Sequence, residues 1–286
     1  MAHELHRDNI EEVVTETLHK ASKTVKDVDA IAVTTKPGLL GSLQVGVKYA
    51  KHLAKLNNKP LIPIHHMEAH ALIARMHQKL TFPFLVLLIS GGHCLLTLVK
   101  DVEDFYLLGK GLDNAPGEVF DKVARRMKLK NMSEYSKICG GKAVELAALQ
   151  ATNPEVFEFP LPLLKYRDCN FSFSGLKDSL VRKLIKKETE HQIAGCGVAC
   201  NDFIFKSIEL LAENTGYKAF RPPPRLCTDN GVMIAWNGLE KLQNHYAPKT
   251  DISLKEIDPT APLGKCLIDE VKKAHIKIKR IRLNSV

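Results

Sequence analysis

The 286-residue sequence is poor in several features that define common protein classes. It has one tryptophan and no low-complexity tract, and no apolar run is long enough to span a bilayer, so we expect no membrane association. Its seven cysteines include no CxxC pair, which argues against a zinc ribbon or thioredoxin-like site and favours reduced, mostly buried thiols. The opening residues, MAHELHRDNIEE, contain acids and lack an apolar core, so we expect neither a secretory signal nor a transit peptide here.

Positive charge is what the sequence has in excess. Lysine and arginine outnumber aspartate and glutamate by nine, and part of this surplus lies in KKAHIKIKRIR near the C-terminus. A basic surplus raises the local concentration of polyanions, which favours nucleic acid or nucleotide partners. The length allows two lobes or one large α/β unit.

The first third of the sequence has the order of a βαβ unit. An amphipathic helix with Asn9 as its cap comes first, and two short apolar strands then flank a second helix. A strand, a helix and another strand in succession predict a parallel pair, and the run HHMEAH falls where the second strand passes into a third helix. The expected ranges are 9–25, 29–34, 42–56, 60–64 and 67–80.

A different pattern begins at Phe82. The closely spaced apolar runs FLVLLIS, CLLTLV and DFYLLG predict an antiparallel meander, and we place the boundary between lobes near 82–90. Pro116 suits the first turn of a helix. Further helices are expected in GGKAVELAALQ, SGLKDSLVRKLIKK, DFIFKSIELLAENTG and MIAWNGLEKLQ.

His66 and His70 are four residues apart, so on a helix they share one face and can bind one metal ion through their imidazole nitrogens. Spacing alone is weak evidence, because HxxxH is frequent by chance. A zinc protease of the HExxH type would need glutamate directly after the first histidine, where Met67 stands. His65 is adjacent and should point elsewhere.

Three other segments contain candidate polar groups. Ser90-Gly91-Gly92-His93 follows a strand and could hold phosphate, although a simple tight turn has the same pattern. The acidic and amide residues at the start of the Pro116 helix suit the helix dipole or a ribose or metal contact. Asp229, in CTDNG, could be an oxygen ligand, but a helix cap is the default interpretation. The residues at the Pro116 helix are Asp113, Asn114, Glu118 and Asp121.

Several motifs occur together and in a fixed order: KPGLLGSLQVGVKYAK, HHMEAH, FPFLVLLISGGH, LDNAPGEVFDKVAR, FSFSGLK, GVACN and PPPRLCTDNGVMIAWNGLE. This set closely resembles the tRNA N6-threonylcarbamoyladenosine synthase family, once called O-sialoglycoprotein endopeptidases, over about residues 5–240. The segments PPPRLCTDNG and NAPGEVFDKVA are similar to the bacterial and mitochondrial branch of that family.

The resemblance implies the two-lobed α/β fold of actin, sugar kinases and chaperone ATPases. Residues 1–88 would form the first lobe, joined by C-terminal helices, and residues 89–286 the second. It implies one divalent metal ion per subunit, iron or zinc, with His66, His70 and Asp229 as ligands. It identifies no catalytic side chain. The positions that match substrate and nucleotide contacts are Leu88, Ile89, Ser90, Gly91, Gly92, Asp121, Gly141 and Asn201.

The implied reaction transfers threonylcarbamoyl from threonylcarbamoyl-AMP to N6 of adenosine 37 in tRNAs that read ANN codons. The expected partners are tRNA and a threonylcarbamoyl-AMP synthase that supplies the adenylate, and a homodimer is an assembly to test. Members of the matching branch imply a mitochondrial location.

The sequence also departs from the family pattern. Family members begin with a β-hairpin that carries a phosphate loop, and no such segment precedes HELHRDNI here. They also have further helix and strand where this chain has only Lys187 to Ala194, so we expect the N-terminal hairpin and one internal strand region to be missing from the fold. Cys196 stands where the family has glycine. Two alternatives therefore stay open: an impaired, shortened form that only binds tRNA or a partner, and a sugar kinase of the same fold.

Overall fold

The computed structural model describes residues 2–150, 159, 162–163, 165–191 and 202–276. It is a mixed α/β structure with a two-stranded and a four-stranded sheet among the described residues. Contacts divide the chain into two compact units, each of which is described by itself below. The first comprises Met1–Phe84, Val99–Phe105 and Pro222–Lys265, and the second comprises Leu85–Leu98, Tyr106–Arg221 and Cys266–Val286.

The first unit is built around a βαβ element, as the sequence predicts. Strands β1 (Ile31–Lys36) and β2 (Leu61–His65) pair in parallel and are connected by α2 (Leu40–Asn57), with Ile31 opposite Leu61 and Thr34 opposite Ile64. Asn58 ends α2 in the left-handed conformation, which asparagine tolerates better than most residues.

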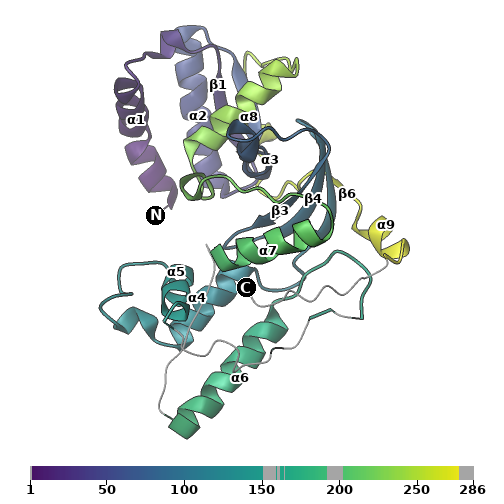
Figure 1. The fold of residues 1–286 in the computed structure, drawn as a ribbon. Coiled ribbons are helices and arrows are strands. Elements are labelled where there is room, and N and C mark those ends of the chain that lie inside the picture. Colours follow the sequence, from purple (N-terminus) through teal and green to yellow (C-terminus); the bar gives the residue numbers. More distant parts are fainter. Residues whose placement is uncertain (1, 151–158, 160–161, 164, 192–201, 277–286) are drawn as a thin grey trace. The chain divides into compact units, whose positions relative to one another are not determined.

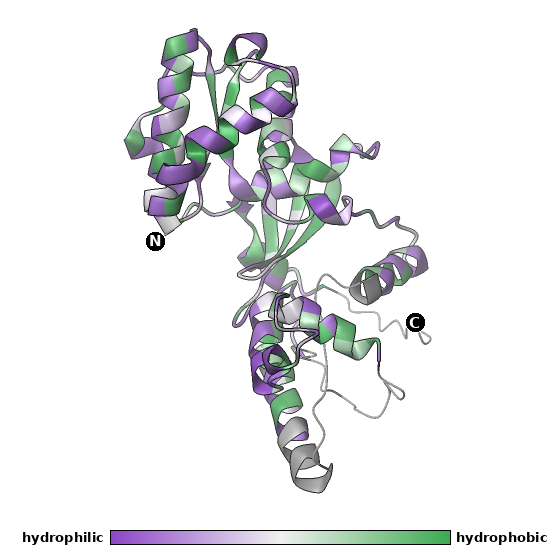
Figure 2. Cartoon of the chain, turned by 90° about the vertical axis from the view of Figure 1, so that its left-hand side faces the viewer, coloured by the Kyte–Doolittle hydropathy of each residue, from purple (hydrophilic) through white to green (hydrophobic). Residues whose placement is uncertain are grey.

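Helices cover both faces of this small sheet (Figure 1). Because successive side chains of a strand point to opposite faces, Ile31 and Val33 pack with α2, whereas Ala30 and Ala32 pack with the other helices. Those helices are α3 (His66–Leu72) and α8 (Gly231–Gln243), which contact each other and the sheet. The strands are mostly green in Figure 2, and the helices show purple and green residues side by side, as expected for helices with one buried face.

Three predicted helix boundaries in this unit are wrong. Helix α1 (Ala2–Lys20) begins seven residues before the expected cap and ends at Lys20 rather than at residue 25, and the side chain of Asn9 donates to the carbonyl of Leu5 within the helix. The helix expected over 67–80 is shorter, because α3 ends at Leu72 and the 3-10 turn η2 (Ile73–Met76) follows. The Leu72 carbonyl, which residue 76 would engage in a continuing α-helix, accepts from the indole of Trp236 at 3.1 Å.

The second unit contains most of the four-stranded sheet, whose order is β3-β4-β5-β6. Strands β3 (Phe84–Ile89), β4 (Cys94–Asp101) and β5 (Asp104–Lys110) follow one another through connections too short for a parallel crossover, so the predicted antiparallel meander is confirmed. The last strand, β6 (Lys265–Cys266), is short.

Helices follow the strands in this unit. Helix α4 (Pro116–Arg126) begins at Pro116, as predicted, and packs against α5 (Gly140–Ala148) around a core that includes Val123, Ala143 and Val144. The other predicted helices are also confirmed. They are α6 (Ser174–His191), α7 (Asp202–Asn214) and, in the first unit, α8; a further short helix, α9 (Ile268–Lys273), follows β6.

The described cysteines are thiols and form no disulfide with one another, but the expectation that they are mostly buried is wrong. Cys94 is buried on the sheet, whereas Cys139 is exposed at the start of α5 and Cys266 is exposed on the two-residue strand β6. Short edge elements do not provide enough neighbouring atoms to cover a side chain. Cys196 and the gap expected between Lys187 and Ala194 involve positions outside the described residues, so the expected omissions stay predictions.

Across the described ranges, no helix is both long and apolar enough to cross a membrane.

Candidate metal centre and substrate positions

The candidate metal centre lies at a junction where a strand passes directly into a helix. Strand β2 ends at His65 and α3 begins at His66, without an intervening loop residue. The side chains of His66 and His70 lie on the same face of α3, with ring centroids 4.6 Å apart and planes at 80°. The expected geometry for two histidines at i and i+4 is therefore present.

His65 makes hydrogen bonds at the junction between β2 and α3 and does not join His66 and His70, as expected from its position directly before His66. Its Nδ1 accepts from the amide of Met67 at 3.2 Å, and its Nε2 lies 3.1 Å from the carbonyl oxygen of Pro262. These partners require a neutral ring with the proton on Nε2. Burial is the main cause that lowers the pKa of His65 to about 4, so the ring is neutral at pH 7.

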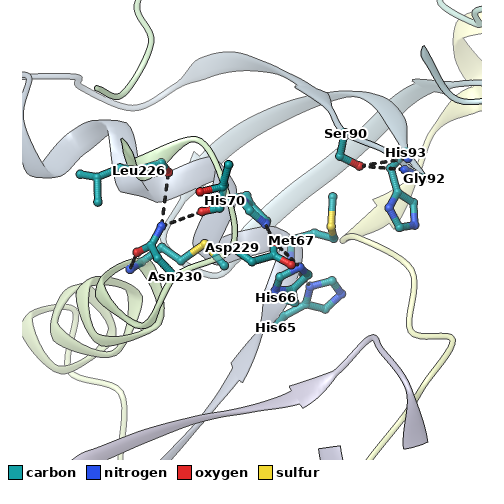
Figure 3. Close-up of polar contacts among 12 residues, drawn as sticks. His65, His66, Met67, His70, Ser90, Gly92, His93, Leu226, Asp229 and Asn230 are labelled. Carbon is teal, nitrogen blue, oxygen red and sulfur yellow. Dashed lines mark hydrogen bonds and ion pairs between the residues drawn. The ribbon is translucent and has the colours of Figure 1, made fainter. Parts of the chain in front are cut away.

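Asp229 reaches the histidines from the loop before α8. Its Oδ1 lies 2.9 Å from Nε2 of His70 and 3.5 Å from Nε2 of His66 (Figure 3). The default expectation that Asp229 caps α8 is wrong, since the cap is Asn230, whose side chain accepts from the amide of Met233 at 2.9 Å. Asn230 therefore accepts the hydrogen bond from the first turn of α8, and the Asp229 carboxylate is available to the histidines.

The three side chains fit a divalent metal ion. One candidate ligand atom from each residue lies within 4.8 Å of the others, and ligand atoms about 2.1 Å from a tetrahedral ion are roughly 3.4 Å apart. The histidine side chains are largely covered, whereas that of Asp229 is 79% exposed. A site with three protein ligands and an accessible side resembles catalytic rather than structural metal sites. Two imidazoles and a carboxylate suit zinc and iron alike.

The predicted substrate positions that the structure describes lie in the second unit. The SGGH segment forms the turn between β3 and β4, and this turn packs against the start of α4. The hydroxyl of Ser90 accepts from the amides of Gly92 at 3.3 Å and His93 at 3.0 Å (Figure 3). The amide of Gly117 donates to the carbonyl of Ser90, and a Cβ on Gly117 would lie 2.7 Å from the Cα of Gly91. Glycine is thus needed for this close packing.

The other predicted positions extend along the same helix. Asp121 lies one turn further into α4, and a Cβ on Gly140 would meet its carboxylate oxygen at 2.4 Å, so the first residue of α5 lies against it. Gly141 is the next residue of α5. Leu88 is buried on β3 and Ile89 is exposed at its end. Asn201 lies outside the described residues.

A small cavity of about 140 Å³ lies beside this turn. Gly92 and His93 line it from the turn, Lys110 from β5, and Asp113 from the segment before α4. Asp113 accepts from the hydroxyl of Ser172 at 2.5 Å and from the amide of Phe173 at 2.8 Å, which connects the LDNAPGEVFDKVAR motif to FSFSGLK. Partial burial raises the pKa of Asp113, but these hydrogen bonds outweigh it and keep the pKa below its ordinary value.

Sequence patterns did not indicate the polar contacts behind the metal centre. Glu240 and Lys241 lie on α8 and are almost fully buried, and they contact Arg75 and Glu68. Periodicity assigns lysine and glutamate to the solvent side of a helix, so only the charge complementarity between distant segments could have indicated these pairs.

The fold and the centre together define an α/β protein with a two-histidine, one-carboxylate cluster suited to a divalent metal. Residues 1–236 match the family model of tRNA N6-adenosine threonylcarbamoyltransferase. The chain is 41% identical to the human mitochondrial tRNA N6-adenosine threonylcarbamoyltransferase over an alignment of 331 positions, gaps included. The alignment covers 99% of this chain and 80% of the relative. The corresponding enzyme named for Ehrlichia chaffeensis is 36% identical, over 86% of this chain and 79% of the relative. The chain therefore belongs to the tRNA N6-adenosine threonylcarbamoyltransferase family, whose members are named as transferases.

Proposed function

We propose that this protein transfers a threonylcarbamoyl group from threonylcarbamoyl-AMP to N6 of adenosine 37 in tRNAs that read ANN codons. The observation that carries the proposal is the meeting of His66, His70 and Asp229 from two segments of the chain, within a sequence that matches the transferase family. The net charge of +9 suits a polyanionic substrate such as tRNA.

In the proposed site, His66, His70 and Asp229 hold one divalent ion. When bound, that ion supplies Lewis-acid stabilisation of phosphate charge on the adenylate. The protein's own groups orient the reactants: the turn at Ser90–Gly92 packs against the N-terminal end of α4, and the helix dipole there suits a phosphate or carboxylate oxygen. Asp121, Gly141 and Asn201 are proposed to contact the nucleotide portion. Placing the exocyclic amine against the mixed-anhydride carbonyl provides most of the catalysis.

The architecture we propose is the two-lobed fold of actin, sugar kinases and chaperone ATPases. Residues 1–88 with C-terminal helices form the first lobe, and the remainder of 89–286 forms the second. The grouping of Pro222–Lys265, which includes α8, with Met1–Phe84 supports the contribution of a C-terminal helix to the first lobe. A threonylcarbamoyl-AMP synthase would supply the substrate. The names of the relatives support a mitochondrial location.

The test is direct transfer in a purified reaction. The protein is incubated with threonylcarbamoyl-AMP, a divalent metal and an ANN-reading tRNA transcript, and threonylcarbamoyladenosine is quantified by mass spectrometry after digestion. We expect product with this tRNA and none with a matched transcript that has guanosine at position 37. Binding of tRNA without product above background would overturn the proposal in favour of a binding-only protein.

A further inference from the structure

Ion pairs and a hydrogen bond connect α8 to α3 and to the 3-10 turn η2 that follows α3. All of the groups involved belong to the first unit. We propose that Glu240 and Lys241 are positioning residues that hold α8 at the distance from α3 at which Asp229 can share a metal ion with His66 and His70. This inference rests on the proposed metal centre and adds the device that sets its geometry.

The first contact is the ion pair between Arg75 and Glu240. The Arg75 Nε lies 2.8 Å and 2.9 Å from the two carboxylate oxygens of Glu240, whose side chain is 4% exposed. The Arg75 guanidinium also donates to the carbonyl of Leu80 and lies 4.1 Å above the ring of Phe82. A buried charge pair with further partners on one member has a restricted geometry, and removing one charge leaves the other uncompensated.

The second contact comes from Lys241. Its Nζ lies 3.4 Å from Oε2 of Glu68 and 3.1 Å from Oε1 of Glu103, and the lysine side chain is 8% exposed. Glu68 is the residue midway between His66 and His70 in α3, on the side turned away from the imidazoles. Lys241 therefore connects α8 to the backbone turn that carries both histidines.

Two neutral contacts set the spacing between these elements. The indole of Trp236 donates to the carbonyl of Leu72 at the end of α3, over 3.1 Å. Gly238 lets α8 lie directly on β1, because a Cβ at this position would meet the Cβ of Ala32 at 2.8 Å. Together with the ion pairs, these contacts fix the separation of α8 from α3 and its position on the sheet.

The geometry of the metal centre depends on the contacts that Glu240 and Lys241 make. Glu240 is eleven residues after Asp229, and a helical rise of 1.5 Å per residue places it roughly 16 Å along the helix. It is thus too far from the metal centre to be a ligand and acts only through the placement of α8. Metal–ligand distances in protein sites lie within about 0.2 Å of their standard values. A small shift of α8 therefore moves Asp229 out of bonding distance and lowers the affinity for the metal ion.

The experiment compares Zn²⁺ affinity between full-length variants by competition with a chromophoric chelator. The variants Glu240→Gln and Lys241→Met remove one charge each at nearly constant size. The His66→Ala/His70→Ala protein measures the background, which is zinc binding by cysteines and other groups outside the proposed centre. The matched control is Asp251→Asn, which breaks the Lys51–Asp251 pair of 2.8 Å in the same unit. We expect Glu240→Gln and Lys241→Met each to weaken binding 10- to 100-fold, and Asp251→Asn to leave it within twofold of wild type.

A conservative variant and a spectroscopic readout separate positioning from general stability. Lys241→Arg keeps the charge and should bind zinc within about threefold of wild type. Trp236 is the sole tryptophan, so its emission reports the α3–α8 contact, and we expect a red shift in Lys241→Met with unchanged far-UV circular dichroism. If Glu240→Gln does not fold, Lys241→Met and Lys241→Arg make the same comparison.

The outcomes are distinguishable. Folded Glu240→Gln or Lys241→Met protein that binds zinc within twofold of wild type overturns the positioning role and leaves the proposed metal centre intact. Wild-type protein that binds no more zinc than His66→Ala/His70→Ala overturns the metal centre itself, and with it the positioning role.

Discussion

The carboxylate of Asp229 lies 2.9 Å from Nε2 of His70, although the two residues are 159 positions apart in the sequence. Asp229 is available for this contact because Asn230 caps α8 in its place. The adjacent aspartate and asparagine in CTDNG thus have separate tasks, one at the candidate metal centre and one at the helix end.

Removing both histidines should abolish specific metal binding. We expect purified wild-type protein to bind about one zinc or iron ion per chain, and His66→Ala/His70→Ala protein to lose that ion, because a single carboxylate does not retain a transition metal. Metal content after desalting, measured by plasma mass spectrometry, checks this. The control is His19→Ala/His52→Ala, which removes two exposed histidines elsewhere in the first unit. Equal metal content in all three proteins would contradict the assignment.

Closing the space between Gly117 and the SGGH turn should impair substrate binding. In Gly117→Ala, the new methyl group would meet the Cα of Gly91 at 2.7 Å, and such overpacking costs about 1–3 kcal/mol. We expect the turn to shift, so that the KM for threonylcarbamoyl-AMP rises more than tenfold while zinc affinity stays unchanged. Steady-state transfer kinetics and the zinc titration measure the two effects.

The matched control for that substitution is Gly175→Ala. Gly175 lies in α6 and has no atom within 4 Å of the place a Cβ would take. Alanine there should be neutral or stabilise the helix by about 0.5–1 kcal/mol, with no change in KM. A KM for Gly117→Ala equal to that of Gly175→Ala would show that the turn does not contact substrate.

Cys94 should resist alkylation in the folded protein. Burial raises the pKa of the Cys94 thiol to about 11, so only about one molecule in a thousand has the reactive thiolate at pH 8. Exposed Cys139 and Cys266 provide internal controls. Peptide mass spectrometry after a short iodoacetamide pulse should find these two labelled and Cys94 unlabelled, and all three labelled in urea. Equal labelling of Cys94 without urea would show that β4 is not packed as described.

Local patterns predicted the βαβ unit, the antiparallel meander and the Pro116 helix, because in each case adjacent residues provide the period or the turn. They also predicted that HHMEAH marks a strand-to-helix junction. Helix ends were harder to predict, since tertiary contacts decide them. Trp236 donates to the carbonyl at the end of α3, and the residues before Asn9 extend α1 back to Ala2.

The candidate metal centre was likewise predictable only in its local part. The histidine spacing placed two side chains on one face, but which partner joins them depends on a contact across most of the chain length. Glu240 and Lys241 had no local signal at all, since buried charges look like surface charges in a sequence. Only the three-dimensional pairing with Arg75 and Glu68 reveals their environment.

The direct passage from β2 into α3 has a consequence for how this segment can vary in length. Each residue added to an α-helix turns the following side chains by about 100°. No loop separates His65 from His66, so no loop residue can adjust to a change in length. One extra or missing residue here would therefore rotate both imidazoles away from Asp229. We expect relatives that retain the centre to differ by substitution in this segment, and to place insertions in the connections between other elements.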